Sequence, residues 1–343
     1  MRIIVVGTFH HKHYAAALSQ GFKALGHEVM DINYSQYDNR GPLKGILDKI
    51  QAKYQVGFPM LKYNRDILAM VKEFKPDFVF FYRCYHVLPR TFRKLKDKGI
   101  CFFTYNNDDP LSNVPSKSFF RYFMKSLRYA SHNFVYRKKN VDDYQRLGID
   151  NVSVLMPNYI TDSNFWKPET QRDIPIGYIG HFENDGRDEC IKALLDAGLP
   201  VTIFNGSYWE RAPLYEDIKQ VIQPAKRNAE YNDTLNRMQI SLVFLSKHNH
   251  DTYTRRCFEV PVTKTLMVSE YTDDMDAMYP EGECAVYFKT KEELVEKCSW
   301  LLNNPSEIER MADNAYRRLM EMGGSEVDRA KEVIALYQQL TIR

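Results

Sequence analysis

Short apolar runs alternate with amphipathic stretches along the first half of the chain. Residues 2–6 are a continuous apolar run that ends in Gly7, a helical pattern follows through residue 27, and residues 28–33 read as a second strand. A buried strand, a helix and another strand in this order are typical of a unit with parallel strands. The alternation continues, with strands predicted at residues 77–82, 100–105, 132–136 and 152–157 and helices at residues 89–98 and 141–148.

Residues 158–168 lack periodicity and end at a proline, and the alternation then begins again. Strands are predicted at residues 174–180, 201–206, 240–245, 265–269 and 285–288, and helices at residues 188–197, 231–238, 291–302 and 306–340, the last broken at Gly323-Gly324. We therefore predict an α/β fold with two tandem doubly wound, Rossmann-like domains at residues 1–168 and 169–324. The helix at residues 325–343 can pack back on the first domain.

Composition excludes several classes of protein. With 44% hydrophobic and 27% charged residues the chain is typical of soluble globular proteins, and its net charge of +3 does not by itself indicate nucleic-acid binding. The six cysteines show neither a C-x-x-C pair nor zinc spacing, so we expect reduced thiols and a cytoplasmic protein. The first apolar run is too short for a signal peptide, and no run approaches the roughly 18 residues of a membrane span.

The strongest candidate chemistry lies at residues 252–259, which read T-Y-T-R-R-C-F-E. The guanidinium groups of Arg255 and Arg256 suit phosphate and the carboxylate of Glu259 suits a sugar diol, although a surface salt-bridge cluster would have the same composition. Gly180 follows a predicted strand and precedes a helix, where a backbone can approach a phosphate. Arg187 begins that helix and either pairs with the same phosphate or is simply solvated.

The first predicted turn of the chain reads G-T-F-H-H-K-H, which is not the G-x-G-x-x-G of dinucleotide-binding proteins. Open α/β sheets bind ligands at the carboxyl ends of their strands, where Gly7, His10 and His11 fall. We expect one or two of the histidines to contact an acceptor, the alternative being loop residues without a role. Consecutive histidines cannot all face one metal ion, and the sequence predicts no metal site.

Asp108 and Asp109 directly follow the predicted strand at residues 100–105 and precede Pro110. A carboxylate at the end of a buried strand is well placed for a general base. Either aspartate could instead cap the next element or start the turn that the proline imposes. One of the pair can cap while the other acts as the base.

Residues 117–128 predict a basic amphipathic helix. Lys117, Arg121, Lys125 and Arg128 share one face, and Phe120, Phe123, Met124 and Leu127 fill another. Such a face can meet anionic lipid on the inner surface of a membrane or guide a phosphorylated acceptor, and it can also be merely solvated.

The order of these motifs resembles a known family. The segments I-G-Y-I-G-H-x5-R, V-T-I-F-N-G, Y-N-D-T-L-N-R-M-Q-I-S-L and T-R-R-C-F-E-V-P follow one another with the spacing of the CgeB-type glycosyltransferase-like proteins. The similarity covers residues 174–335, while the first half matches mainly in pattern, through Gly7, L-G-H-E-V at residues 25–29 and N-D-D-P at residues 107–110. This resemblance implies the GT-B architecture, in which two such domains face a central cleft.

The resemblance also implies site roles. Glu259 would receive the ribose hydroxyls of a donor nucleotide, Arg255 or Arg256 with Arg187 would neutralise its diphosphate, and Gly180 would admit the backbone to it. Related retaining transferases carry an E-x7-E element, but here the first position is Asp251, a shorter carboxylate. That departure weakens a catalytic role copied to Asp251 and leaves open whether the reaction retains or inverts configuration.

These observations predict a metal-independent glycosyltransferase that moves a sugar from a nucleotide-diphosphate sugar, with no further cofactor. The expected acceptor is a hydroxyl of a cell-surface glycan, a lipid-linked glycan or a protein. A similar Arg-then-Glu arrangement occurs in phage-type DNA glucosyltransferases, so a DNA-modifying enzyme is an alternative. A non-catalytic binding protein of the same fold is another, although it would have little use for Glu259 together with the two arginines.

Overall fold

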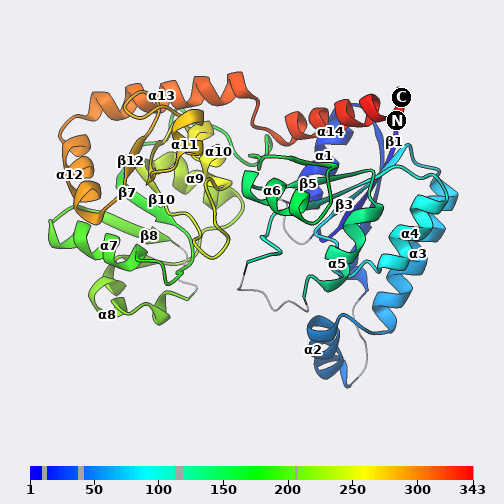
Figure 1. Cartoon of the computed structure of the whole chain (residues 1–343). Helices are drawn as coiled ribbons and strands as arrows, with labels where there is room; N and C mark the ends of the chain where they lie inside the picture. The colour runs from blue at the N-terminus through cyan, green and yellow to red at the C-terminus, as the bar shows by residue number, and fades with distance from the viewer. Residues whose placement is uncertain (10–13, 38–41, 113–118, 205–207, 343) are drawn as a thin grey trace. The chain divides into compact units, whose positions relative to one another are not determined.

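The computed structural model describes residues 1–9, 14–37, 42–112, 119–204 and 208–342. The chain divides into two compact units: unit 1 comprises Met1–Met156 and Glu326–Arg343, and unit 2 comprises Pro157–Ser325 (Figure 1). The chain first passes from unit 1 to unit 2 after Met156, before the expected boundary at residue 168, because residues 157–168 are bound to unit 2. The backbone N–H groups of Phe165 and Lys167 donate to the side chains of Asn232 and Asn236, at 3.1 and 2.7 Å.

Unit 1 contains a six-stranded parallel sheet in the order β2-β1-β3-β4-β5-β6. Its strands are β1 (Arg2–Gly7), β2 (Glu28–Asn33), β3 (Phe78–Tyr82), β4 (Phe102–Asn106), β5 (His132–Val135) and β6 (Val152–Val154). Its helices are α1 (Ala15–Ala24), α2 (Lys44–Tyr54), α3 (Phe58–Phe74), α4 (Pro89–Asp97), α5 (Arg121–Ser126), α6 (Lys138–Arg146) and α14 (Glu326–Thr341), with 3₁₀ turns η1 (Tyr34–Gln36) and η2 (Leu127–Tyr129).

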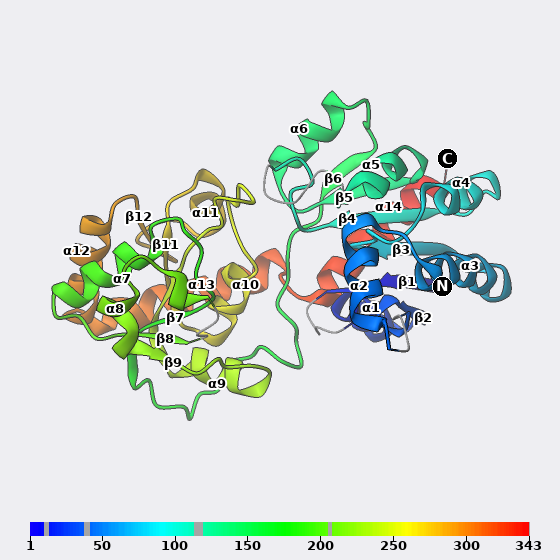
Figure 2. The same cartoon turned by 90° about the horizontal axis from the view of Figure 1, so that it is seen from below.

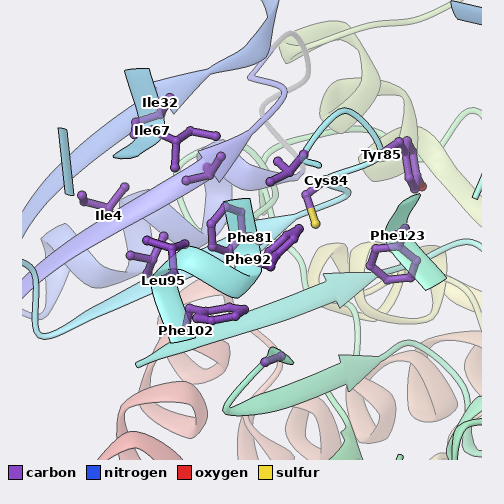
Figure 3. Close-up of a cluster of buried hydrophobic side chains, with 14 of the residues drawn as sticks. Ile4, Ile32, Ile67, Phe81, Cys84, Tyr85, Phe92, Leu95, Phe102 and Phe123 are labelled. Carbon is purple, nitrogen blue, oxygen red and sulfur yellow. The ribbon is translucent and has the colours of Figure 1, made fainter. Parts of the chain in front are cut away.

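Both faces of this sheet are covered, as its continuous apolar strands require. On one face, Phe81 and Phe102 of the sheet pack with Ile67 of α3, Phe92 of α4 and Phe123 of α5 (Figure 3). On the other face, Phe78 contacts Phe22 of α1 and Tyr337 of α14, with ring centroids 5.7 and 5.1 Å apart. The last helix of the chain therefore belongs to the core of the first unit.

Helix α5 is shorter than the predicted basic helix at residues 117–128. It spans Arg121–Ser126 and tightens into η2, where the N–H of Ala130 donates to the carbonyl of Leu127 before the chain enters β5. Lys117 lies outside the described residues. Residues 34–76, which carry no prediction above, form η1, α2 and α3.

Unit 2 repeats the architecture with a parallel sheet in the order β12-β11-β10-β7-β8-β9. Its strands are β7 (Ile174–Ile179), β8 (Val201–Phe204), β9 (Ile222–Gln223), β10 (Met238–Val243), β11 (Leu266–Glu270) and β12 (Val286–Phe288). Its helices are α7 (Arg187–Asp196), α8 (Tyr215–Ile218), α9 (Ala229–Arg237), α10 (Arg256–Glu259), α11 (Asp273–Met278), α12 (Lys291–Leu302) and α13 (Pro305–Met322), with 3₁₀ turns η3 (Trp209–Arg211), η4 (Lys219–Val221) and η5 (Pro261–Thr263).

The core of unit 2 joins its central strands to two neighbouring helices. Ile176 of β7 and Leu242 of β10 belong to one buried cluster with Ile191 of α7 and Leu294 and Leu301 of α12. Helices α7 and α12 lie side by side in both views of the unit (Figures 1 and 2). The predicted α/β fold, with two doubly wound parallel sheets, is therefore confirmed.

All six cysteines lie in the described part of the chain, and none of them forms a disulfide. Among the described helices, none is both long enough and apolar enough to cross a bilayer.

The packing of α1 against α14 gives a first prediction. A Cβ atom added to Gly21 would collide with the backbone of Glu326 at the start of α14, so Gly21→Ala should force the helices apart. We expect it to lower the free energy of unfolding by about 1–3 kcal/mol. Gly45 of α2 has open space around it, and the control Gly45→Ala should be neutral or stabilising. Equal stability of the two variants in urea unfolding would contradict this account.

Candidate functional site

The strand order of unit 2 marks where its ligand site should be. Strands β7 and β10 are neighbours, and the chain winds away from them in opposite directions, through β8 and β9 on one side and β11 and β12 on the other. In open parallel sheets the loops that leave two such strands part at their carboxyl ends and form a ligand-binding crevice. Gly180 follows β7, and residues 244–255 connect β10 to α10. The predicted donor-binding residues therefore lie in the segments that follow these two strands.

Gly180 and Arg256 meet at the end of β7. A Cβ atom on Gly180 would overlap the hydroxyl of Tyr178 and lie 2.9 Å from Nη2 of Arg256. The guanidinium of Arg256 lies over the ring of Tyr178, 5.7 Å from its centroid. The carbonyl of Gly180 accepts a hydrogen bond from the indole of Trp209 at 2.9 Å. Glycine is required here because any side chain would displace the arginine.

Glu259, at the end of α10, is fully buried, and only one of its two carboxylate oxygens accepts a hydrogen bond. Its Oε2 atom accepts a hydrogen bond from the hydroxyl of Tyr231 at 2.7 Å. Its Oε1 atom lies 2.8 Å from Nε of Arg255, in an ion pair but outside hydrogen-bonding geometry. Among the described residues, Oε1 of Glu259 and Nε of Arg256 are buried atoms with no hydrogen-bond partner. The site thus holds an acceptor and a donor that a ligand can complete.

Arg187 is placed differently from the other two arginines. It is buried, and its Nε and Nη2 atoms donate to the two carboxylate oxygens of Asp185 at 2.8 and 2.5 Å. Its Nη1 atom donates to the hydroxyl of Tyr178 and to the carbonyl of His181, at 2.9 and 2.7 Å. These bonds occupy all three nitrogens of the guanidinium. The geometry favours a role in fixing the loop after β7 over direct contact with a ligand.

Residues 181–186 are also tied to the loop after β10. Glu183 accepts hydrogen bonds from the hydroxyl of Ser246 at 2.8 Å and from His181 at 3.1 Å, and its carboxylate lies 3.7 Å from Arg187. Burial alone would raise the pKa of Glu183, but these hydrogen bonds and the nearby guanidinium hold it down at about 2. The two loops that border the site are therefore held together by an ionised carboxylate.

Asp251, the shorter carboxylate in the position of the first glutamate of E-x7-E, is half-buried in the loop after β10. Its backbone N–H donates to the carbonyl of Ser246 at 3.0 Å. The next residue, Thr252, donates through its hydroxyl to Asp274 of α11 and accepts through its carbonyl from Thr272, at 2.7 and 2.6 Å. These bonds fix the approach of the chain to α10.

In unit 1, the equivalent divergence of the chain falls between β1 and β3. Gly7 ends β1, and a Cβ atom there would lie 2.8 Å from the carbonyl oxygen of Tyr82 and 2.9 Å from Cβ of Ala15. The glycine therefore allows the close packing of β1, β3 and α1. His10 and His11, predicted to contact the acceptor, lie outside the described residues.

The two candidate bases have different environments. Asp109 has no exposed surface, and it accepts hydrogen bonds from the N–H of Leu111, from Asn140 and from Lys139 at 3.0, 3.0 and 3.2 Å. Burial would raise its pKa, but these bonds and the charge of Lys139 lower it overall. Asp109 thus fixes the turn at Pro110 and holds α6, which is the turn-forming alternative that the sequence left open for one of the pair.

Asp108 has 27% of its side chain exposed and belongs to a polar cluster at the ends of β3 and β4. It accepts from Nη2 of Arg83 at 2.7 Å and from the hydroxyl of Tyr85 at 2.6 Å. Arg83 has a left-handed backbone, with φ of 50°, in which a residue with a side chain is strained. Strain of this kind is held only where the surroundings fix the residue, as the ion pair with Asp108 does.

Sequence reasoning missed Tyr231, Arg83 and Tyr85. Tyr231 lies in the first turn of α9, far along the chain from Glu259, and no local spacing links the two. The pair Arg83 and Tyr85 directly follows a strand in the same way as Asp108, and that position was an available signal. Among the described residues, His, Cys, Asp and Glu side chains form no group of three or more that could hold a metal ion.

Comparison with known proteins follows the same division of the chain. Residues 187–333 match the family model described as glycosyl transferase-like. The whole chain superposes on the sucrose-phosphate synthase of Thermosynechococcus elongatus with a TM-score of 0.73 and 12% identity, with 100% of each chain covered. It superposes on Anabaena HepE, solved with UDP and glucose, with a TM-score of 0.70 and 11% identity over 99% of this chain and 100% of that one.

A glycosyltransferase from Rickettsia africae is similar over 99% of this chain and 98% of its own, with a TM-score of 0.69 and 14% identity. At such identities these likenesses establish the fold, which is the GT-B fold. No relative was found among curated protein sequences. The class is therefore a protein of the GT-B fold, and residues 187–333 match the glycosyl transferase-like family model.

The half-buried carboxylate of Glu183, which joins the two loops, predicts how stability depends on pH. The pKa of Glu183 in the folded state, about 2, is below its ordinary value of 4.5. The ionised group therefore stabilises the protein above pH 4.5, and this contribution is lost as the pH falls from 4.5 toward 2. Glu183→Gln should lower the free energy of unfolding at neutral pH by on the order of 2 kcal/mol.

The difference between wild type and Glu183→Gln should shrink as the pH of urea unfolding is lowered through this window. Glu321→Gln, which changes an exposed carboxylate on α13, is the matched control and should leave stability within roughly 0.5 kcal/mol of wild type. A difference for Glu183→Gln that is independent of pH would refute the assignment.

Proposed function

We propose that this protein is a glycosyltransferase that binds a UDP-sugar in unit 2 and transfers the sugar to an acceptor hydroxyl. The observation that carries the proposal is the pair of buried, incompletely bonded groups at the point where β7 and β10 diverge. One is the guanidinium of Arg256 over Gly180, and the other is the carboxylate of Glu259. A nucleoside diphosphate offers both an anion and a diol, so it can complete both groups.

Glu259 is proposed to accept hydrogen bonds from the ribose hydroxyls through Oε1. Tyr231 donates a hydrogen bond to the other carboxylate oxygen, and Arg255 forms an ion pair with the group, so both residues position Glu259. A carboxylate that receives two hydroxyl groups makes charge-assisted hydrogen bonds, each worth about 1.5–3 kcal/mol. That is enough to make nucleotide affinity depend on this one side chain.

Arg256 is proposed to neutralise the diphosphate, with Gly180 leaving room for it. When the bond between sugar and diphosphate breaks, negative charge grows on the leaving phosphate, and a guanidinium already in place lowers the energy of that state. We propose that this cation serves in place of a metal ion. Arg187 is assigned a supporting part, because its nitrogens are engaged in holding the loop after β7.

The choice of uracil as the base rests on likeness to HepE, whose structures contain UDP, UDP with glucose and UDP-glucose. The acceptor is proposed to be a glycan, a lipid-linked glycan or a protein of the cell surface. The reduced state of all six cysteines supports a cytoplasmic location.

Asp108 is proposed as the general base if configuration is inverted, because it is the exposed member of the aspartate pair. Its carboxylate would take the proton of the acceptor hydroxyl as the new glycosidic bond forms. Arg83 and Tyr85 would orient it through their hydrogen bonds. If configuration is retained, Asp251 is the carboxylate nearest in sequence to the donor residues, and no base is required of Asp108.

Substitution of Glu259 tests the donor site. Glu259→Gln keeps the volume of the side chain but loses the charge, so affinity for UDP should fall about 10- to 100-fold in isothermal titration calorimetry. Tyr231→Phe should weaken binding by a smaller factor, since the carboxylate itself remains. Glu230→Gln, an exposed neighbour on α9, should bind as wild type does.

Unchanged UDP affinity in folded Glu259→Gln would remove this residue from the donor site. A hydrolysis screen of wild type against UDP-, GDP-, dTDP- and CMP-sugars would then show whether the nucleotide or the position of the donor site had been assigned incorrectly. Hydrolysis of none of them, together with retained nucleotide binding, would identify a binding protein rather than an enzyme.

The aspartate pair gives a separate prediction. Asp108→Asn should lower kcat by about 10²- to 10⁴-fold with little change in donor affinity, because it removes the proton acceptor and no donor contact. Asp109→Asn should instead lower the melting temperature, because it weakens buried bonds to Lys139 and Asn140, while the folded fraction keeps its turnover. Full turnover in folded Asp108→Asn would eliminate Asp108 as the base.

A further inference from the structure

Helix α2 of unit 1 carries a stripe of exposed apolar side chains. Leu43, Ile46, Leu47, Ile50 and Tyr54 fall at the spacing of one helical face. The surface continues through Val56 into the start of α3, at Phe58 and Leu61. These eight side chains, called here the α2 patch, are between 40% and 88% exposed. The described chain has 17 exposed large apolar residues in all, so nearly half of them fall within residues 43–61.

Polar contacts beside this apolar face and at the end of α2 attach the helix to unit 1. The side-chain amide of Gln51 donates to the hydroxyl of Tyr34 at 2.8 Å. At the end of the helix, the buried Gln55 donates to the carbonyl of Phe119, and Arg121 of α5 donates to the carbonyl of Tyr54. Helix α2 is thus attached to unit 1 through Gln51 and through its C-terminal end. Figure 1 shows the helix at the margin of that unit.

Basic side chains border the patch. Residues 42–66 contain the basic residues Lys44, Lys49, Lys53, Lys62 and Arg65 against two acidic residues, Asp48 and Asp66. Asp66 is paired with Lys62 and Arg65. Asp48 is paired with Lys44, while Lys49 and Lys53 are exposed and follow the same edge of the apolar stripe. Long lysine side chains can lay their methylene groups along an apolar surface and extend their charges beyond it.

An apolar stripe with a cationic border fits the surface of an anionic bilayer. Apolar side chains enter the boundary between headgroups and acyl chains, and each lysine near the surface adds attraction to anionic lipid. A second copy of the chain fits less well, because two such patches would bring five basic residues and only two acidic residues from each side together. Charge complementarity therefore selects lipid as the occupant.

The basic helix expected at residues 117–128 does not supply this contact alone. Phe120, Phe123 and Leu127 are buried in the core of unit 1, and Arg121 is bonded to the end of α2. Only Lys125 and Arg128 of its described basic residues are exposed. They can add charge beside α2 but provide no apolar surface.

We propose that the α2 patch inserts into the surface of an anionic membrane, with α2 in the plane of the interface and its lysines at the headgroups. The inference is independent of the proposed donor chemistry, since it rests on unit 1 surface residues only. It places an acceptor carried by a lipid, or any other membrane-bound acceptor, within reach of the enzyme.

The test is co-sedimentation of the full chain with vesicles of phosphatidylcholine alone and with vesicles that also contain phosphatidylglycerol. Wild type should bind the anionic vesicles and release them as salt is raised. Ile46→Gln/Ile50→Gln should weaken binding on the order of 100-fold, by loss of apolar insertion. Lys49→Gln/Lys53→Gln should weaken it roughly 30-fold, by loss of two charges.

Two matched controls carry the same chemical changes elsewhere on unit 1. Lys94→Gln/Lys96→Gln alters exposed residues of α4, and Leu147→Gln alters an exposed leucine after α6, so both should bind as wild type does. All the substituted side chains are exposed, and unchanged melting temperatures would show that each variant is folded. Hydrolysis of UDP-sugar without vesicles should be the same in the α2 variants and wild type, which keeps this test separate from that of the donor site.

Absence of binding to anionic vesicles at low salt would overturn the proposal, as would α2 variants that bind like wild type. Sedimentation velocity covers the rival occupant. A dimer that becomes a monomer in Ile46→Gln/Ile50→Gln, without vesicle binding by wild type, would assign the patch to a second copy of the chain and reject the membrane.

Discussion

The arrangement of the candidate site depends on one constraint, the absence of a side chain at Gly180, because a Cβ atom there would collide with the hydroxyl of Tyr178 and the guanidinium of Arg256. Since no side chain projects at the end of β7, a cation from the element after β10 can lie directly over that strand and against Tyr178. Strands β7 and β10 are neighbours through parallel pairing. The charge at the end of β7 is supplied by the guanidinium of Arg256, for which Gly180 leaves room. Glu259 is placed by the same short helix that carries the arginine, α10.

Arginines of similar appearance in the sequence serve different physical ends in this fold. Arg187 is surrounded by acceptors and donates hydrogen bonds to a carboxylate, a tyrosine hydroxyl and a carbonyl, which it holds together. Arg256 keeps a buried nitrogen without a hydrogen bond. The pair Asp108 and Asp109 divides in the same way, one saturated and enclosed, the other partly exposed beside a strained arginine. In each pair, the residue with the more complete hydrogen bonding, Arg187 or Asp109, supports the structure. The other residue, Arg256 or Asp108, is the candidate for contact with substrate.

The layout of both sheets could be predicted from the sequence, because buried parallel strands are continuous apolar runs and the helices between them are strongly periodic. The placement of Gly180, Arg255, Arg256 and Glu259 at one edge followed from that layout and from the motif order. What could not be predicted depends on contacts between distant residues. Tyr231 reaches Glu259 from another helix, and the two asparagines that draw residues 157–168 into unit 2 lie almost 70 positions further along the chain.

The last helix of the chain has a consequence for dissecting the protein into parts. Helix α14 follows unit 2 in the sequence, yet its Ala330 and Val333 are buried in unit 1 and Tyr337 rests on Phe78. A fragment ending at Met156 would therefore lack part of its own core and would leave one side of its sheet and α1 open to water. Expression of unit 1 alone requires a rearranged gene in which residues 326–343 are joined by a linker to residues 1–156. Unit 2, whose residues are continuous in the chain, can be cut out directly.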